Sequence, residues 1–169
     1  MYQICNGIII KYNRLGEIIS SEYDTGGFRR PLYEEALRNG AEQVIQPGDS
    51  VTILGGGAGV VTVYASRYSG SNGNLQVFEA STEMVEILQE TINRNRSCAP
   101  IQIHHAIVGE LHEAWGQVSE RNHVSITDLP ASDVYVIDIE GAELNVIKDL
   151  PDCRAVVVES HGALGSPTS

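Results

Sequence analysis

A run of glycines directly after a short apolar segment constrains the fold of this chain most strongly. Residues 51–54 have strand character and lead straight into residues 55–59, which read Gly-Gly-Gly-Ala-Gly. Glycine adopts backbone conformations with positive φ and lets a ligand approach the main chain closely. A helix over roughly residues 60–68 follows the glycines, and the N–H groups of its first turn suit an anion. The pattern predicts a strand, a tight loop and a helix, the opening unit of an α/β fold.

Strands and helices alternate along the chain after this loop. The apolar and helical periodicities predict strands at 75–79, 101–105, 134–139 and 155–159, and helices at about 82–95 and 142–150. The strand at 134–139 is almost continuously apolar, as a strand buried on both faces should be. The order predicts a doubly wound, mostly parallel Rossmann-like sheet with helices on both faces.

The segment before this pattern has a character of its own. The β-rich runs 8–10 and 18–19 are separated by the turn-like residues 13–16, and together they favour a hairpin. Pro31 suits the first turn of a helix that runs toward Val44. This segment is therefore expected to form an extension of strands and a helix before the core.

The length of 169 residues fits one domain. We expect a single domain over residues 1–169, in which residues 1–47 form an N-terminal extension and residues 48–169 form a cofactor-binding core. Within that core, residues 107–130 predict a mixture of strand and loop.

An acidic residue follows the glycine loop where a cofactor ribose would lie. Glu79 ends the next predicted strand, and a carboxylate at that place accepts hydrogen bonds from two ribose hydroxyls. A dinucleotide fingerprint requires G-x-G-x-x-G, and its third position, counted from Gly55, falls on Val60. The run fits G-x-G-x-G instead, at Gly55, Gly57 and Gly59, a spacing typical of S-adenosylmethionine loops. A tight turn without a ligand is the alternative interpretation of the glycines.

Carboxylates also follow the predicted strand 134–139. Ligands of open parallel sheets bind at the carboxyl ends of the strands, near the point where the strand order reverses. Asp138 is therefore expected near the ligand, with Glu140 on the loop that follows. Alternatively, Glu140 and Glu143 are acids in the first turn of a helix, where they interact favourably with the helix dipole. For Glu143, a place near the ligand and a place at the helix terminus fit equally well.

Residues 138–148, which read DIEGAELNVIK, carry a resemblance to a known family. They are similar to the D-x-E-G-A-E…V-L-K signature of FkbM-type methyltransferases, and the resemblance covers roughly residues 47–162. It implies a class I fold, S-adenosylmethionine as the cofactor, and O-methylation of a small-molecule or glycan hydroxyl. A degenerate, non-catalytic methyltransferase fold that acts as a binding or interaction module is the alternative function.

The resemblance also implies roles for single residues. The glycines of the loop would line the methionine moiety, the acid after the second strand would hold the ribose, and the segment after the third strand would border the adenine. The implied cofactor-binding residues are Gly55, Gly57, Gly59, Glu79, Ala106 and Asp138.

A general base assists methylation of a hydroxyl group. The candidates are Asp138, Glu140 and His161, all expected at the carboxyl edge of the sheet. His161 has the alternative interpretation of a solvent-exposed loop residue. The same residues with Glu159 offer ligands for a metal ion, but their spacing does not require one and no metal site is predicted.

Two features depart from the family pattern. The family usually carries an acidic residue two positions before the first glycine of the loop, and Ile53 stands there in this chain. The loss of that carboxylate predicts weaker cofactor binding. The fold usually continues into a sixth and a seventh strand, which we expect to be absent here. The fifth strand is then an exposed edge, and an exposed edge favours a homodimer.

Charge and composition exclude several other classes. Twenty-two acidic residues against eleven basic ones give a net charge of −11, which disfavours nucleic acid as a partner. No stretch approaches the roughly 20 apolar residues of a membrane-spanning helix, so no membrane partner is predicted. Three cysteines without a C-x-x-C pair suggest a reduced, cytoplasmic protein. The scarcity of lysine on an acidic chain favours a halophilic source, and an ordinary acidic cytoplasmic protein is the alternative interpretation.

Overall fold

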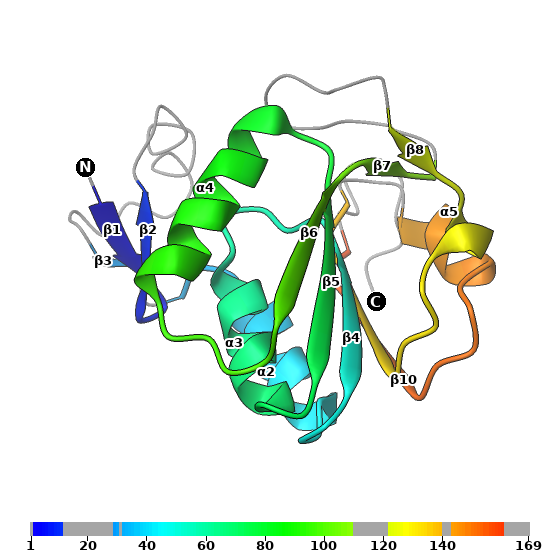
Figure 1. Cartoon of the computed structure of the whole chain (residues 1–169), viewed down its shortest axis with the longest axis horizontal. Coiled ribbons are helices and arrows are strands. Elements are labelled where there is room, and N and C mark those ends of the chain that lie inside the picture. Colours follow the sequence, from blue (N-terminus) through cyan, green and yellow to red (C-terminus); the bar gives the residue numbers. More distant parts are fainter. Residues whose placement is uncertain (1, 12–28, 31, 110–121, 140–142, 161–169) are drawn as a thin grey trace.

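Five parallel strands form the central sheet of the molecule (Figure 1). The computed structural model describes residues 2–11, 29–30, 32–109, 122–139 and 143–160. In spatial order the strands are β10 (Ala155–Val158), β9 (Val134–Ile137), β4 (Ser50–Leu54), β5 (Asn74–Glu79) and β6 (Ile101–His105). The strand order reverses between β4 and β9, where ligands bind in doubly wound sheets. The predicted fold class is confirmed.

Helices cover both faces of this sheet. α2 (Glu35–Val44), α3 (Val60–Ser69) and α4 (Thr82–Arg94) pack on one face, and α5 (Glu143–Lys148) packs on the other. The Ser81 hydroxyl accepts a hydrogen bond from the Met84 N–H and caps α4. α2 begins at Glu35, later than the proline signal predicts. None of the described helices is long and apolar enough to cross a membrane.

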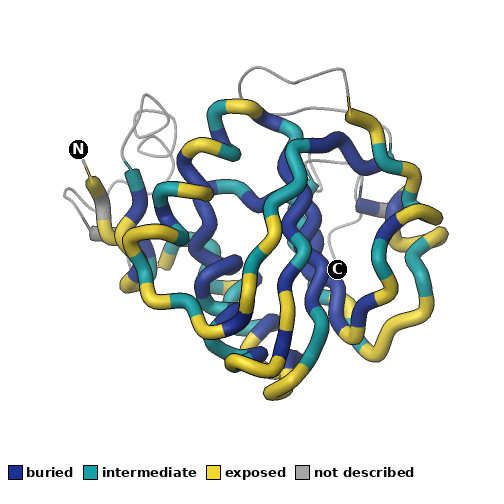
Figure 2. Tube along the Cα trace, viewed as in Figure 1, coloured by how far each residue is buried: buried dark blue, intermediate teal, exposed yellow. Residues whose placement is uncertain are grey.

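Side chains that alternate along the strands fill the two cores. Ile53 and Val136 pack in the core that α2, α3 and α4 cover. Their neighbours Leu54 and Ile137 pack in the second core with Val146 of α5. The central strands are therefore buried on both faces (Figure 2), which explains their continuous apolar sequence.

The segment after β6 forms a small parallel pair. β7 (Ile107–Val108) and β8 (His123–Val124) lie side by side, and the short 3₁₀ helix η1 (Ile126–Asp128) follows. The sequence predicts strand and loop in this segment. It does not predict the pairing, because the two strands are short and come from separate parts of the chain.

The N-terminal extension adds a three-stranded sheet. β1 (Tyr2–Cys5) lies between β2 (Ile8–Lys11) and β3 (Arg29–Arg30). A tight turn joins β1 to β2, with φ of 46° at Asn6 and 81° at Gly7. The structure therefore contains a hairpin of strands 2–5 and 8–11, which the sequence did not predict. The predicted pairing of runs 8–10 and 18–19 is not tested, because residues 12–28 lie outside the described part of the chain.

Hydrogen bonds and apolar contacts hold this small sheet against α4. The Asn95 side-chain amide accepts a hydrogen bond from the Ile9 N–H (3.0 Å) and donates one to the Ile9 carbonyl (2.8 Å). Cys5 and Ile8 share a buried cluster with Met84 of α4. The extension is thus packed against the helices that begin beside the glycine loop.

Candidate functional site

The glycine loop follows β4 and has the conformation that only glycine adopts easily. Gly55, Gly57 and Gly59 have φ values of 84°, 49° and 86°. A Cβ atom at Gly55 would lie 1.8 Å from the Asp138 carbonyl oxygen, and one at Gly59 would lie 2.8 Å from Leu88 Cδ1. At Gly57 the nearest atom, a carboxylate oxygen of another residue, is 3.7 Å away. The protein itself fills the space at two of the glycines, and Gly57 is the one with room beside it.

Glu79 connects the loop to α4. Its Oε2 accepts a hydrogen bond from the Gly57 N–H (2.9 Å), and its Oε1 accepts one from the Ser81 N–H (2.8 Å). The side chain lies at the carboxyl end of β5, as the sequence predicts, and only 8% of the residue is exposed. A carboxylate has about four acceptor positions, so Glu79 retains capacity for further donors.

Ala106 lies beside Glu79 at the end of the neighbouring strand. Its N–H donates to the Glu79 carbonyl oxygen (3.0 Å), and its side chain is buried. Two of the predicted cofactor residues are therefore adjacent at the same edge of the sheet.

Asp138 lies beside the loop at the other side of β4. Its N–H donates to the Leu54 carbonyl (2.8 Å), and its own carbonyl lies against Gly55. Glu143, for which the sequence left two interpretations open, is buried at the start of α5. The predicted catalytic candidates Glu140 and His161 lie outside the described residues.

A further carboxylate, on Glu34, reaches the loop from the N-terminal side of α2. Its Oε1 is the atom 3.7 Å from a Cβ at Gly57, and its Oε2 accepts a hydrogen bond from the Val61 N–H of α3 (3.3 Å). Tyr33 also donates to this carboxylate. The sequence did not single out Glu34, because an acid at the start of a helix is an ordinary feature of helix termini.

Burial changes the ionisation of this pair. It raises the pKa of Glu34 to about 7, and the nearby Glu159 carboxylate adds to the rise, although the hydrogen bonds from Tyr33 and Val61 oppose it. Burial and the Glu34 carboxylate hold the pKa of Tyr33 well above its usual value. The site therefore contains a carboxylate, on Glu34, whose negative charge its hydrogen-bond donors balance only in part.

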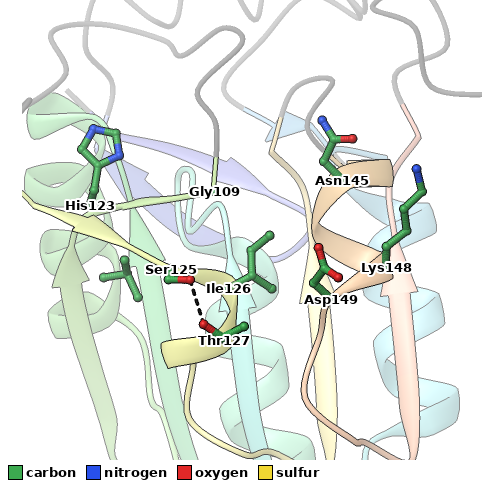
Figure 3. Close-up of a pocket in the computed structure, with 9 residues that line it drawn as sticks. Gly109, His123, Ser125, Ile126, Thr127, Asn145, Lys148 and Asp149 are labelled. Carbon is green, nitrogen blue, oxygen red and sulfur yellow. Dashed lines mark hydrogen bonds between the residues drawn. The ribbon is translucent and has the colours of Figure 1, made fainter.

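A hollow of about 610 Å³ lies beside α5. In Figure 3 the β8–η1 segment and α5 stand on opposite sides of it, and the side chain of Ile126 points between them. Hydroxyl, amide, imidazole and charged groups make up much of its lining. The lining residues are Gly109, His123, Val124, Ser125, Ile126, Thr127, Asn145, Lys148 and Asp149.

Metal ligands are not gathered in the described part of the chain. Among those residues, no group of three histidine, cysteine, aspartate or glutamate side chains could hold a metal ion. Within the described residues, Cys5, Cys98 and Cys153 form no disulfide.

Several solved structures are similar to this chain. An S-adenosylmethionine-dependent O-methyltransferase from Thermotoga maritima is 17% identical, with 83% of this chain and 46% of that chain covered at a TM-score of 0.46. An S-adenosylmethionine-dependent methyltransferase from Aquifex aeolicus is 18% identical, with 82% and 65% covered at a TM-score of 0.48. Protein arginine methyltransferase 10 from Arabidopsis thaliana is 12% identical, with 70% and 31% covered at a TM-score of 0.46.

The chain spans less than two thirds of the length of each of these structures. No protein-family model matches the sequence, and no curated protein matches it either. The resemblance to FkbM-type enzymes therefore stays a prediction, and the function has to be inferred from the chain's own residues.

Proposed function

We propose that this protein is an S-adenosylmethionine-dependent methyltransferase that binds its cofactor at the glycine loop. The observation that carries this proposal is the hydrogen bond between Glu79, at the end of β5, and the N–H of Gly57, in the loop after β4. It joins the loop and the acid that the sequence singles out, beside the reversal of strand order where ligands of such sheets bind.

The groups at this edge suit the parts of the cofactor. A Cβ atom at Gly57 would clash with no described atom, its nearest neighbour being Glu34 Oε1 at 3.7 Å, and the methionine end would lie near this point, at the N-terminus of α3. Glu79 has acceptor capacity for the two ribose hydroxyls. Ala106 gives the next strand end a small apolar surface for the adenine. The cofactor itself supplies an electrophilic methyl group on its sulfonium.

The protein's part in the reaction is to align donor and acceptor. Methyl transfer is an in-line displacement, and holding two reactants in the right geometry supplies much of the rate acceleration. A general base near the acceptor hydroxyl takes up its proton. Asp138 is the described candidate for this role, and Glu140 and His161 are the further candidates from the sequence.

We propose a small-molecule or glycan hydroxyl as the methyl acceptor. The net charge of −11 opposes binding of a polyanion. The hollow beside α5 carries polar side chains such as Ser125, Asn145 and Lys148, which suit a ligand rich in hydroxyl groups. A screen with S-adenosylmethionine labelled on the methyl group, against pools of glycans, small alcohols, RNA and protein, tests this choice. Label that enters only RNA or protein would contradict it.

A non-catalytic role is the second candidate function, and the end of β4 favours it. Ile53 is 2% exposed and packs in the core, so β4 itself presents no carboxylate to the cofactor. A binding module would still take up S-adenosylhomocysteine but would transfer no methyl group to any pool of acceptors.

Calorimetric titration with S-adenosylhomocysteine tests the proposed cofactor site. We expect the wild-type protein to bind, and we expect Glu79→Ala to weaken binding by about 10- to 100-fold, because charge-assisted hydrogen bonds to the ribose are lost. Glu86→Ala, which removes an exposed carboxylate from α4, is the matched control and should bind as the wild type does. Equal affinity of the Glu79 and Glu86 variants would remove the ribose role.

A further inference from the structure

Glu34 combines a strained backbone with a carboxylate that reaches the glycine loop and the first turn of α3. It has a left-handed backbone conformation, with φ of 52° and ψ of 29°, which costs a residue other than glycine about 1 kcal/mol or more. Its side chain does not cap α2. It extends instead to the glycine loop and the first turn of α3.

Among the side chains that the structure describes, carboxylates lie near Glu34 and its neighbour Tyr33, and no cation forms an ion pair with Glu34. Glu159 follows β10 and raises the pKa of Glu34. Asp138 follows β9 and raises the pKa of Tyr33, the direct neighbour of Glu34. The ion pairs within the described residues are Arg38–Glu42, Arg94–Glu90 and Arg154–Asp49, and none of them includes Glu34.

A cationic group of a ligand would complete this site. The Cβ position of Gly57 lies 3.7 Å from the Glu34 carboxylate, in the place proposed above for the methionine end of the cofactor. That end carries an α-ammonium group, which donates charge-assisted hydrogen bonds to a carboxylate. The carboxylate group of the same methionine suits the N–H groups at the start of α3.

We propose that Glu34 binds the α-ammonium group of S-adenosylmethionine, so that the N-terminal extension completes the cofactor site on the core. This assignment rests on the proposed function. It gives a role to the left-handed backbone, because that conformation directs the side chain toward the loop. It also supplies a carboxylate at the end of β4, where Ile53 and Leu54 are apolar.

Two ligands separate this role from a structural one. S-adenosylhomocysteine carries the amino acid end, whereas 5′-methylthioadenosine has the same adenine, ribose and sulfur without it. We expect Glu34→Gln to weaken S-adenosylhomocysteine binding by about 10-fold or more and to leave 5′-methylthioadenosine binding unchanged. Glu35→Gln, which removes the adjacent carboxylate at the start of α2, is the matched control and should change neither affinity.

The pH dependence of wild-type binding gives a second readout that needs no variant. The ammonium group binds the ionised carboxylate, so a proton must leave Glu34 when the ligand binds below pH 7. We expect the affinity for S-adenosylhomocysteine to fall by about tenfold between pH 8 and pH 6, with release of a proton. The affinity for 5′-methylthioadenosine should stay constant over this range.

Each outcome has a distinct meaning. A wild-type protein that binds neither ligand overturns the proposed function and this assignment with it. A wild-type protein that binds both, with a Glu34→Gln variant that binds S-adenosylhomocysteine equally well, overturns only the assignment of Glu34. A variant that loses both ligands to the same extent shows that Glu34 supports the loop and does not contact the ammonium group, which also overturns the assignment.

Discussion

Glu34 occupies a conformation and an environment that cost the folded protein free energy. Strained backbone and buried charge gather at functional sites, where the rest of the structure holds them in place. Two glycines of the loop, in contrast to Glu34, are explained by contacts within the protein. A side chain at Gly55 or Gly59 would collide with Asp138 or Leu88. Glycine is therefore needed at both positions for the packing of the protein, whether or not a ligand binds.

The pKa of Glu34 predicts a pH-dependent effect on stability. Its value in the fold, about 7, lies above its ordinary value of 4.5, so the folded state binds more protons than the unfolded state between these pH values. The contribution of Glu34 to the free energy of unfolding therefore falls as the pH rises from about 4.5 to about 7. We expect Glu34→Gln to be more stable than the wild type by about 2 kcal/mol at pH 8 and equally stable at pH 5.

Urea unfolding at the two pH values measures this difference, with Glu35→Gln as the control that should follow the wild type. A Glu34→Gln variant that is less stable than the wild type at pH 8 would mean that the ionised carboxylate stabilises the fold. The half-buried charge of Glu34 would then need no ligand to explain it.

At the scale of elements, local signals predicted most of the fold. The apolar runs of β4, β5 and β9 each lie within a few residues of sequence, and the structure contains all three strands. The N-terminal hairpin carries the Asn6-Gly7 signal typical of a two-residue turn, but the stronger isoleucine runs directed the prediction to a later turn.

The features that the sequence did not reveal depend on contacts between distant segments. β7 and β8 form a strand pair only because two short segments meet in space. Glu34 lies 27 positions before Val61, its hydrogen-bond partner, and no spacing rule connects the two. The candidate site could therefore be located from the sequence at the loop, Glu79 and Asp138, while its contribution from the extension could not.

The contact between the loop and β9 predicts a large effect at Gly55. An alanine there would keep φ near 84° and bring its Cβ to 1.8 Å from the Asp138 carbonyl oxygen, so the backbone would have to move. We expect Gly55→Ala to lower the free energy of unfolding by about 3 kcal/mol or more. Gly48→Ala is the matched control, because Gly48 also has a positive φ, 96°, and no atom lies within 4 Å of its Cβ position.

We expect Gly48→Ala to cost only about 1 kcal/mol, the effect of the backbone conformation alone. Urea unfolding of both variants measures the difference between them. Similar losses for the two would show that the loop tolerates displacement from β9.

At the scale of the whole molecule, the excess of acidic residues dominates the electrostatics. A net charge of −11 over 169 residues destabilises the folded state through repulsion among like charges. Salt screens that repulsion, since the Debye length falls from about 10 Å at 0.1 M to about 3 Å at 1 M. The same charge excess underlies the expectation of a halophilic source.

We expect the melting temperature to rise as NaCl is increased from 0.05 M to 1 M, with most of the rise below 0.5 M, where screening changes most. Differential scanning fluorimetry measures this, and sucrose of equal osmolality is the uncharged control. A melting temperature that is constant or falls with salt would contradict a dominant role for charge repulsion.

Strand β10 forms an edge of the central sheet, where a second copy of the chain could pair. β10 pairs only with β9 in the described sheet, and Val156 on β10 is 38% exposed. We expect pairing of two copies at this edge, seen by light scattering as twice the 18.3 kDa mass of the chain, and loss of the dimer in Val156→Lys because a lysine blunts an edge strand. A wild-type protein with the mass of one chain would contradict this expectation.

The central claim is that the glycine loop, Glu79 and Glu34 together hold S-adenosylmethionine. A crystal structure of the protein with S-adenosylhomocysteine tests it most directly. We predict density for the ligand with its ribose hydroxyls on Glu79, its amino acid end beside Gly57 and its ammonium group on Glu34. Ligand density elsewhere on the molecule, or a glycine loop that stays free of ligand at saturating concentration, would contradict the claim.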